Sequence, residues 1–414
     1  MHGYKYLLIS TACSLIFSTQ LHAAIAPDAA SINVKQSCGT EDNCFEDMSV
    51  LSDWIHNTRL PSASAPLTVD IGPGSFSGYN CNNSGYTTLR GAGRSSTRLI
   101  QAGNKAAVVV TECEKLSFQD MTISGSGNTA IGIDWSGRGN STYSNIELSA
   151  KGSFTSFAWG DHDINGNVCS ASDEKSEHFF FGSTIKAEGG FYNNAYYTFC
   201  AVTWIYGSEI ITIADNSGAT GNVATNAGFR VQGDGVQIQV FGSRVTSRSG
   251  TGTITNTPTP GLGLVGATVS DGGTFHMHGG IIGVIADNPA INTPASGVTV
   301  YGSTSKVHII DTAFNVKATG NAAAYRIWNY GGDSIVNTPF LWSAGSMPPV
   351  GNNNGDSVIS ETGQDMYVET DCLANGDCNS TGVETHIMVY NQNCSVDGAW
   401  FDTTTGRCRG DLGN

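Results

Sequence analysis

The chain has 414 residues and a formal net charge of −15, and only 13% of its residues are charged. Nucleic acids and anionic membranes bind through basic surfaces, so this charge balance argues against both as partners. An acidic polysaccharide is still allowed, because a local cluster of arginines could bind one. The 52 glycines, with Ser, Thr and Asn between short apolar runs, favour an all-β protein of many short strands.

The first 26 residues have the pattern of a secretory signal peptide. Lys5 supplies a positive start, residues 7–17 are mostly apolar, and small residues near position 23 offer cleavage sites. Cys13 allows a lipoprotein as the alternative, although the residues before it fit that signal poorly. No later apolar run is long enough to span a bilayer. We therefore expect an exported protein that is extracellular, periplasmic or at the cell surface.

Residues 27–66 are predicted to form an N-terminal cap. Val50, Leu51, Trp54 and Ile55 would share one face of a short amphipathic helix, with Asp47 as its N-cap. Such a helix would shield the open edge of the first strands that follow.

An internal repeat occupies the next predicted domain, residues 67–345. A six-residue unit with apolar first and last positions recurs roughly 30 residues apart, as in solenoid proteins. Its copies are residues 118–123, 143–148, 180–185, 205–210, 240–245, 277–282, 309–314 and 335–340. The third position always carries a residue suited to tight turns: Asp120, Asn145, Gly182, Gly207, Gly242, Gly279, Asp311 and Asn337.

A second strand follows each repeat, so that each copy would form one coil of a parallel β-helix. Stacked coils lie about 4.8 Å apart and bury a continuous core that no single coil could form. If apolar residues alternate inward along these strands, their neighbours face solvent. The predicted outward set is Asp134, Ala158, Arg230, Gln232, Thr299, Tyr301, Arg326 and Trp328.

The cysteines predict disulfides, because removal of the signal peptide leaves ten of the eleven in an exported chain. Connectivity is open, and sequential pairing is the simplest arrangement: Cys38–Cys44, Cys81–Cys113, Cys169–Cys200, Cys372–Cys378 and Cys394–Cys408. The last two pairs fall in residues 346–414, which we expect to form a small disulfide-tied β segment.

In these features the chain resembles the pectin-lyase-like superfamily of right-handed parallel β-helices. Residues 69–76 and 89–93 look like its entry coils, and the turn residues from Asp120 to Asn337 look like its stacked turns. The resemblance implies the fold over residues 65–340. It implies no activity, because the superfamily contains lyases, hydrolases, esterases, tailspikes and adhesins, and no catalytic motif of these enzymes is found in the chain.

Asp161, His162 and Asp163 form the first candidate catalytic cluster. Two carboxylates beside an imidazole could hold Ca²⁺ or tune a proton-transfer group. The alternative is a polar turn that hydrogen-bonds to itself. No further cofactor is expected.

Arg230, beside Asp234, is the second catalytic candidate. In lyases of this fold an arginine can take up the proton next to a uronate carboxylate, with positive charge stabilising the intermediate. Arg326 would be an outer contact on the same face. Ordinary salt bridges are the alternative for both arginines.

Aromatic side chains suggest where sugar rings would bind. Trp135, Trp159, Tyr301 and Trp328, with Arg326, would line a groove along the second strand. The residues before the turn positions (Phe181, Tyr206, Phe241 and His278) could form a second stacking platform, or could simply pack as structural filler.

The sequence therefore predicts a secreted carbohydrate-active β-helix protein that degrades or binds an extracellular polysaccharide, acting as a lyase or glycoside hydrolase if it is catalytic. The alternative is a non-catalytic adhesin or tailspike-like surface protein. The sequence leaves open a monomer or a homotrimer.

Overall fold

The computed structural model describes residues 25–163, 165–190, 192–214, 226–249, 264–286, 295–302, 304–310 and, in short stretches, 312–409. Within these ranges the structure describes side chains up to residue 316 and, beyond it, those of Ile327 and Trp328. Nearly all of the predicted signal peptide and most of residues 369–414 thus lie outside the described residues. Within the described part, no helix is both long and apolar enough to cross a membrane.

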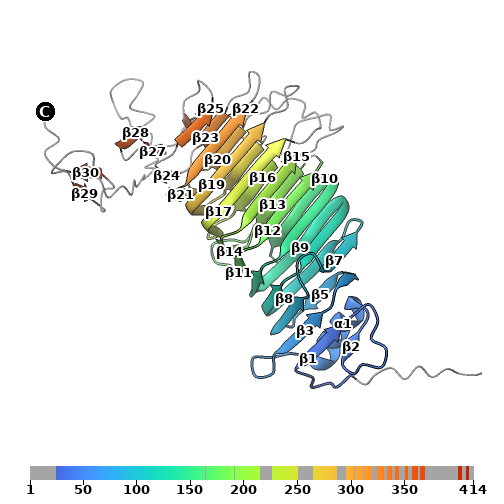
Figure 1. Ribbon diagram of the computed structural model, residues 1–414. Helices are drawn as coiled ribbons and strands as arrows, with labels where there is room; N and C mark the ends of the chain where they lie inside the picture. Colours follow the sequence, from blue (N-terminus) through green and yellow to red (C-terminus); the bar gives the residue numbers. More distant parts are fainter. Residues whose placement is uncertain are drawn as a thin grey trace, which may run out of the picture.

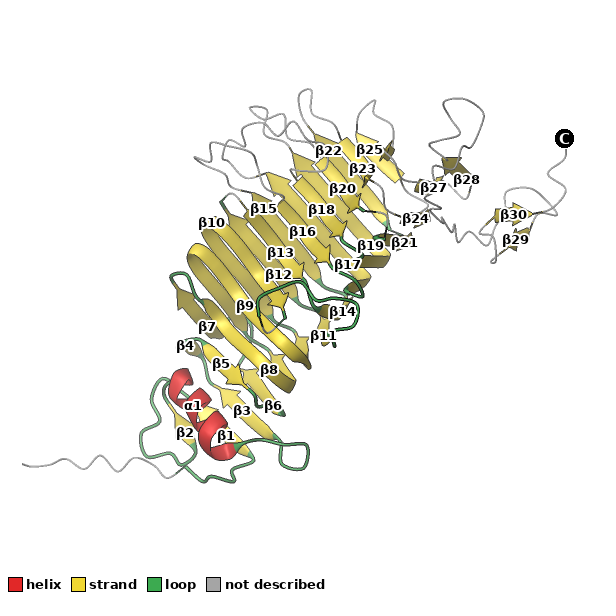
Figure 2. Cartoon of the chain, turned by 180° about the vertical axis from the view of Figure 1, so that it is seen from behind, coloured by secondary structure: helices red, strands yellow, loops and turns green. Residues whose placement is uncertain are grey.

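The chain winds into a right-handed parallel β-helix, as the sequence predicts (Figures 1 and 2). Within the coils, each strand pairs in parallel with the strand one coil further along, and the strands form three faces that we call sheets 1, 2 and 3. Several long strands bend at a corner and contribute to more than one sheet. The repeat spans sheets 1 and 2, and the predicted second strand belongs to sheet 3.

The strands of each sheet follow one another along the helix axis. Sheet 1 contains β1 (Ser31–Val34), β3 (Leu67–Ile71), β6 (Thr87–Gly91), the ends of β8 (Ala106–Gln119) and β9 (Thr122–Ser144), β11 (Ser176–Phe181), β14 (Ala201–Tyr206), the starts of β17 (Gln237–Ser249) and β19 (Thr274–Ala286), β21 (Lys306–Ile310), β24 (Asp333–Asn337) and β27 (Ser357–Glu361). Sheet 2 contains β4 (Gly74–Phe76), β7 (Thr97–Ala102), the starts of β9 and β10 (Glu147–His162), β12 (Thr184–Gly189), β15 (Glu209–Ala214), the ends of β17 and β19, β22 (Ala313–Ala318) and β25 (Leu341–Ala344). Sheet 3 contains β5 (Tyr79–Asn82), the start of β8, the middle of β9, the end of β10, β13 (Tyr192–Thr198), β16 (Asn226–Gln232), β18 (Leu264–Ser270), β20 (Ala295–Tyr301), β23 (Ala324–Tyr330) and β26 (Val350–Asn352).

The turn between sheets 1 and 2 explains the repeat. Asp120, Asn145, Gly182, Gly207 and Gly242 all have φ between 51° and 54°, the left-handed conformation that Gly, Asn and Asp adopt most readily. Adjacent turns are joined along the axis, since the Asn145 side-chain amide donates to the Asp120 carboxylate at 2.6 Å. The repeat therefore marks one fixed corner of the coil.

The first seven copies of the repeat stack in the predicted register, from Phe118 opposite Tyr143 to Met277 opposite Ile309. The predicted register of the last copy is wrong by one residue. Ile309 pairs with Val336 rather than Ile335, and Phe314 pairs with Leu341 rather than Phe340. The apolar pairs Ile335–Val336 and Phe340–Leu341 make both alignments equally good in sequence, so pattern alone could not choose between them.

The N-terminal helix α1 (Met48–Trp54) is capped by Asp47, whose carboxylate accepts from the Ser49 backbone N–H at 2.6 Å. A π-helical turn, η1 (Ile55–Arg59), continues it, and the short strand β2 (Cys44–Phe45) pairs with β1. Leu51 and Ile55 are buried as predicted, but Val50 is 54% exposed. The buried face consists instead of Met48, Leu51, Ser52 and Ile55, which follow one another at the three- and four-residue spacing of a helix face.

Three disulfides occur among the described residues: Cys38–Cys44, Cys81–Cys113 and Cys169–Cys200. They match the sequential pairing; the other two predicted bridges lie outside the described side chains. Near the C-terminus, β27 pairs antiparallel with β28 (Gln364–Val368), and β29 (Trp400–Asp402) pairs with β30 (Arg407–Arg409).

Candidate functional site

A groove of about 990 Å³ lies between helix α1 and the first coils of sheet 3. Asp53 and His56 line it from the helical side, and Asp134 of β9 lies at its far end. Most of the remaining lining is amide and hydroxyl groups and small side chains: Ser49, Ser52, Ser77, Gly78, Asn80, Asn82, Gln101, Asn104 and Thr111. The groove is therefore rich in neutral hydrogen-bonding groups, with apolar side chains such as Val109 and Ile131 among them.

Asp134 and His162 form an ion pair where the groove ends. His162 Nε2 lies 3.2 Å from Asp134 Oδ1, and both side chains are partly exposed. The hydrogen bond to Asp134 raises the pKa of His162 to about 9; burial opposes this shift, and the Asp163 carbonyl, 2.6 Å from Nδ1, supports it. The imidazole is therefore protonated at neutral pH, with one N–H donated to each oxygen.

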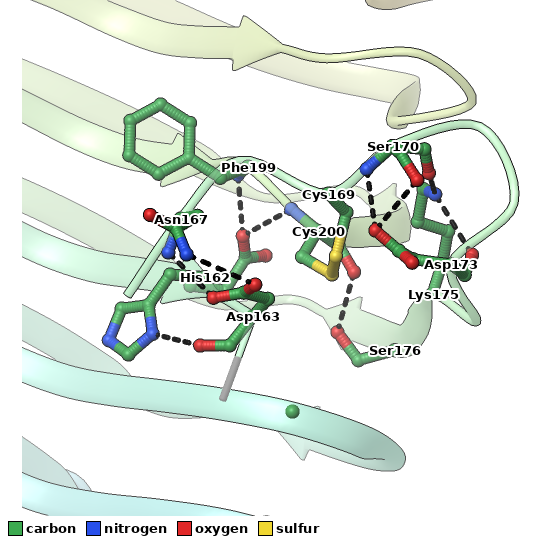
Figure 3. The surroundings of a disulfide bond; sticks show 12 residues. His162, Asp163, Asn167, Cys169, Ser170, Asp173, Lys175, Ser176, Phe199 and Cys200 are labelled. Atoms are coloured by element: carbon green, nitrogen blue, oxygen red, sulfur yellow. Dashed lines mark hydrogen bonds between the residues drawn. A yellow bond between two sulfur atoms is a disulfide. The ribbon is translucent and has the colours of Figure 1, made fainter. Parts of the chain in front are cut away.

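Asp161 and Asp163 have separate structural roles, and Figure 3 shows Asp163 bonded to Asn167 of its own loop. Asp161 is 2% exposed and accepts from the backbone N–H groups of Phe199 and Cys200 and from the Thr198 hydroxyl, at 2.6 to 2.8 Å. Burial raises its pKa to about 6 despite these bonds. Asp163 instead accepts from backbone N–H groups of its own loop, which lower its pKa.

These contacts contradict the prediction that Asp161 and Asp163 flank a reactive imidazole. Asp161 has no access to a substrate, because its oxygens hold the turn that carries the Cys169–Cys200 disulfide. The two carboxylates also do not converge on one point. Among the described residues, no group of three or more His, Cys, Asp or Glu side chains is placed to hold a metal ion. The suggested Ca²⁺ therefore has no cluster of three carboxylate, imidazole or thiol groups to bind it in that part of the chain.

Arg230 lies further along the same face of sheet 3, within a cluster of aromatic rings. Its guanidinium is 4.8 Å from the Tyr197 ring centre and 5.6 Å from that of Tyr192. Phe157 packs against both tyrosines, and Phe199 packs on Tyr197. These contacts hold the guanidinium by cation–π attraction rather than by a carboxylate.

Asp234 does not pair with Arg230, contrary to the prediction. The Arg230 guanidinium donates to Gln232 at 3.2 Å, and the Gln232 amide donates to Asp271 at 2.7 Å. Asp234 is exposed, in the turn after β16, and its carboxylate lies against Gly272. The turn carries the side chain past the end of the strand, so sequence proximity does not bring the two groups together.

Trp135 and Trp159 are wrongly predicted as substrate-binding residues, because both are 0% exposed. Trp159 stacks between Trp135 and Tyr196 inside the helix, and His178 packs edge-on against both tryptophans. Alternation with Asp134 and Ala158 outward already places both tryptophans inward, so the groove assignment conflicts with the predicted outward set; in β10 the alternation itself fails, since Ala158 and Trp159 are consecutive buried residues. Ala158 is likewise buried rather than outward.

The remaining predicted substrate contacts lie further along sheet 3. Tyr301 is partly exposed, in the column of outward residues that includes Gln232 and Ser270. Trp328 pairs with Thr299 and is 5% exposed. The Arg326 side chain lies outside the described residues. A role for these three in binding stays a prediction.

The outer face of sheet 1 carries a ladder of aromatic rings that stack on one another. Tyr206 lies 5.2 Å from Phe181 and 5.0 Å from Phe241, with interplanar angles of 6° and 10°. A second stack, Phe179 on Trp204 at 4.7 Å, was not predicted. Because the faces of Tyr206 are covered on both sides, the ladder fits structural filler better than a platform for sugars.

The chain is thus a parallel β-helix with a groove beside α1 and an aromatic cluster around Arg230 further along sheet 3. No protein-family model matches the chain, and no curated protein matches it. It is similar to several solved structures. Escherichia coli YbhC has 10% identity over 81% of this chain and 88% of that chain, with a TM-score of 0.40. Pectin methylesterase PemA from Erwinia chrysanthemi has 11% identity over 78% and 92%, with a TM-score of 0.35.

The A-module of Azotobacter vinelandii mannuronan C-5 epimerase AlgE4 is similar at 10% identity over 76% of this chain and 94% of that one, with a TM-score of 0.22. At these identities the likeness concerns the fold, and no activity follows from it.

Proposed function

We propose that this chain is a secreted carbohydrate-active protein that binds a polysaccharide along the outer face of sheet 3. The observation that carries the proposal is the continuity of this face. The groove beside α1 leads to the Asp134–His162 pair, and the aromatic cluster around Arg230 follows in the next coils. Amides, hydroxyls and partly exposed rings suit a ligand that offers many hydroxyl groups and apolar ring faces.

The Asp134–His162 pair is the proposed reactive centre if the protein turns its ligand over. With a pKa of about 9, the His162 imidazolium carries the proton at neutral pH, and it would donate this proton when a ligand oxygen replaces Asp134 as the acceptor of the Nε2 proton, while the Asp163 carbonyl holds the ring through Nδ1. Proton donation to a leaving oxygen suits glycosidic-bond cleavage. A lyase reaction with His162 as the base would need the neutral imidazole and so would be favoured only at alkaline pH.

Export is part of the proposal. The three disulfides of the described residues are typical of oxidising compartments outside the cytoplasm. Together with the signal-peptide pattern of residues 1–26, they support a protein that meets its polysaccharide outside the cell.

The test is a screen of the purified full chain against polygalacturonate, alginate, glycosaminoglycans and neutral glycans. Binding is followed by calorimetry, and turnover by absorbance at the wavelength of unsaturated sugars and by reducing ends. We expect at least one polysaccharide to bind. Failure of every glycan to bind would overturn the proposal.

Asp134→Asn and His162→Gln separate an enzyme from an adhesin. If the protein is an enzyme, both substitutions should lower turnover about 100-fold or more, as for loss of a general acid, with little change in unfolding. Asp70→Asn is the matched control, because Asp70 forms a partly exposed ion pair with Arg90 on sheet 1. Binding without turnover in the unmodified protein would favour the adhesin.

A further inference from the structure

The groove beside α1 contains few charged groups for its size. Its carboxylates are those of Asp47, Asp53 and Asp134, and Lys105 is its one ammonium group within the part of the chain that the structure describes; that lining contains no arginine. A polymer of uronic acids carries a carboxylate on every sugar, so it binds where positive charge is concentrated. The groove has no such concentration.

The carboxylates of the groove do not form a site for a cationic sugar either. Asp47 caps α1 through hydrogen bonds to backbone N–H groups, and Asp134 forms the ion pair with His162. Asp53 remains, and Lys105, which has the opposite charge, lines the same groove. The charges therefore offset one another, and neither cations nor anions form a continuous row.

Neutral amides provide much of the hydrogen-bonding capacity of the groove. Asn80, Asn82 and Asn104 are exposed and line it. The Asn82 amide oxygen accepts from the Asn83 amide at 2.9 Å, and the Asn104 amide oxygen accepts from the Thr129 backbone N–H at 3.0 Å. The NH₂ group of each is thus left to donate to a ligand. The Asn80 amide has no hydrogen-bond partner among the described residues.

Strand register arranges the outward residues of the groove in two lines that run along the helix axis from β5 through β8 to β9. The lines are Asn80–Val109–Asp134 and Asn82–Thr111–Ser136. Adjacent coils are about 4.8 Å apart, so an extended chain of sugars that lies along the axis can contact several coils at once. Such a chain would meet amide, apolar and hydroxyl groups in turn before it reaches the Asp134–His162 pair.

The first line continues from Asp134 through Gly160 and Tyr197 to Arg230. Burial lowers the pKa of Arg230, and the charge of the nearby Asp271 opposes this shift. Arg230 thus has a counter-charge in the fold, as His162 has one in Asp134. The charged groups further along the face are therefore balanced as well.

We propose that the groove beside α1 binds an uncharged polysaccharide whose chain lies along the helix axis. The inference rests on the proposed function and narrows its ligand to neutral glycans. The asparagine NH₂ groups donate to hydroxyl and ring oxygens, and Val109 and Ile131 contact the C–H groups of the sugar rings. An uncharged ligand leaves the balanced charges of the groove undisturbed.

Calorimetry on the full chain tests the proposal with hexasaccharides of three charge classes. The neutral probes are cellohexaose, xylohexaose and maltohexaose; the charged probes are hexagalacturonic acid and the hexamer of glucosamine. We expect at least one neutral probe to bind at least about tenfold more tightly than either charged probe. Its affinity should change less than about twofold between roughly 0.02 and 0.5 M salt, because no ion pair forms between protein and ligand.

Asn80→Ala tests the contact between the groove and the neutral probe. The exposed Asn80 amide has no partner among the described residues, so the melting temperature should stay the same, while affinity falls about three- to tenfold. Asn57→Ala is the matched control, since Asn57 is exposed outside the groove and its amide donates to the Asp53 carbonyl at 2.9 Å. That change should leave affinity unchanged.

Asp53→Asn tests the role of charge, because it keeps the shape of the side chain and removes its carboxylate. The affinity for the neutral probe should change less than about twofold, whereas a site for cationic sugars would lose about tenfold or more.

The outcomes separate the two proposals. If either charged probe binds as tightly as the best neutral probe, or if Asn80→Ala retains full affinity, or if Asp53→Asn loses tenfold, the groove does not select an uncharged chain, while polysaccharide binding stands. If no glycan of the panel binds, both proposals fail.

Discussion

The outer faces of sheets 1 and 3 use the same strand geometry in opposite ways. On sheet 1, Tyr206 is covered on both ring faces by its neighbours in the ladder. On sheet 3, Arg230 has no ion-pair partner among the described residues, and in the same part of the chain the Thr299 hydroxyl has no hydrogen-bond partner. Where the same kind of side chain recurs on successive coils, the copies pack on one another along the helix axis. Where the outward residues differ from coil to coil, polar groups are left without a partner in the fold and can interact with a ligand.

This difference explains why aromatic content is a poor guide to binding in a β-helix. Identical positions on successive coils stack the same kind of ring about 4.8 Å apart, so a ladder stabilises the fold. A binding face is recognised instead by groups that the fold leaves unsatisfied.

The largest expected effect concerns the inside of sheet 3. Trp159→Ala should lower the free energy of unfolding by about 3 to 5 kcal/mol, because it leaves a large cavity among rings that are fully buried. Urea denaturation measures it. A loss below about 1 kcal/mol would contradict the core position of Trp159 and revive its predicted role in binding.

Tyr206→Ala tests whether the aromatic ladder on sheet 1 stabilises the fold rather than binds a ligand. The change removes two stacked contacts and should cost about 1 to 3 kcal/mol of stability. Glycan affinity measured by calorimetry should stay the same. Loss of affinity with little loss of stability would mean that the ladder, and not sheet 3, carries the ligand.

The smallest expected effect is the pH dependence that His162 gives to stability. Its folded pKa of about 9 lies above the usual 6.5, so the folded state holds the proton more tightly. The stabilisation is therefore complete below pH 6.5 and is lost as the pH rises towards 9. Asp161, with a pKa of about 6, changes charge mainly below this window.

His162→Gln should flatten the dependence of the melting temperature on pH between 6.5 and 9, relative to the unmodified protein. His278→Gln is the matched control, at an exposed histidine of sheet 1. An unchanged slope in His162→Gln would show that Asp134 does not hold the imidazolium.

The sequence predicts the coil well, because turns such as those at Asn145 and Gly207 need residues that tolerate positive φ, and few residue types do. It predicts the orientation of side chains less well. Ala158 departs from the predicted alternation, because it is buried together with the next residue, Trp159, and the last repeat shifts by one because two apolar residues are adjacent.

The site was only partly predictable for a similar reason. Arg230 and His162 stand out by chemistry, and Asp134 was assigned to the outward set. Its pairing with His162 depends on how successive coils stack. Nothing in the sequence distinguishes Thr268 and Thr299 from other threonines, because threonine is common in strands. Only the structure shows that their hydroxyls are buried and unpaired among the described residues.

The most direct test of the central claim compares Arg230→Gln with Tyr206→Ala in calorimetric titrations with the same oligosaccharide. Sheet 3 as the binding face predicts that affinity falls about tenfold or more in Arg230→Gln and is retained in Tyr206→Ala. Retained affinity in Arg230→Gln with a loss in Tyr206→Ala would contradict it and assign the ligand to sheet 1.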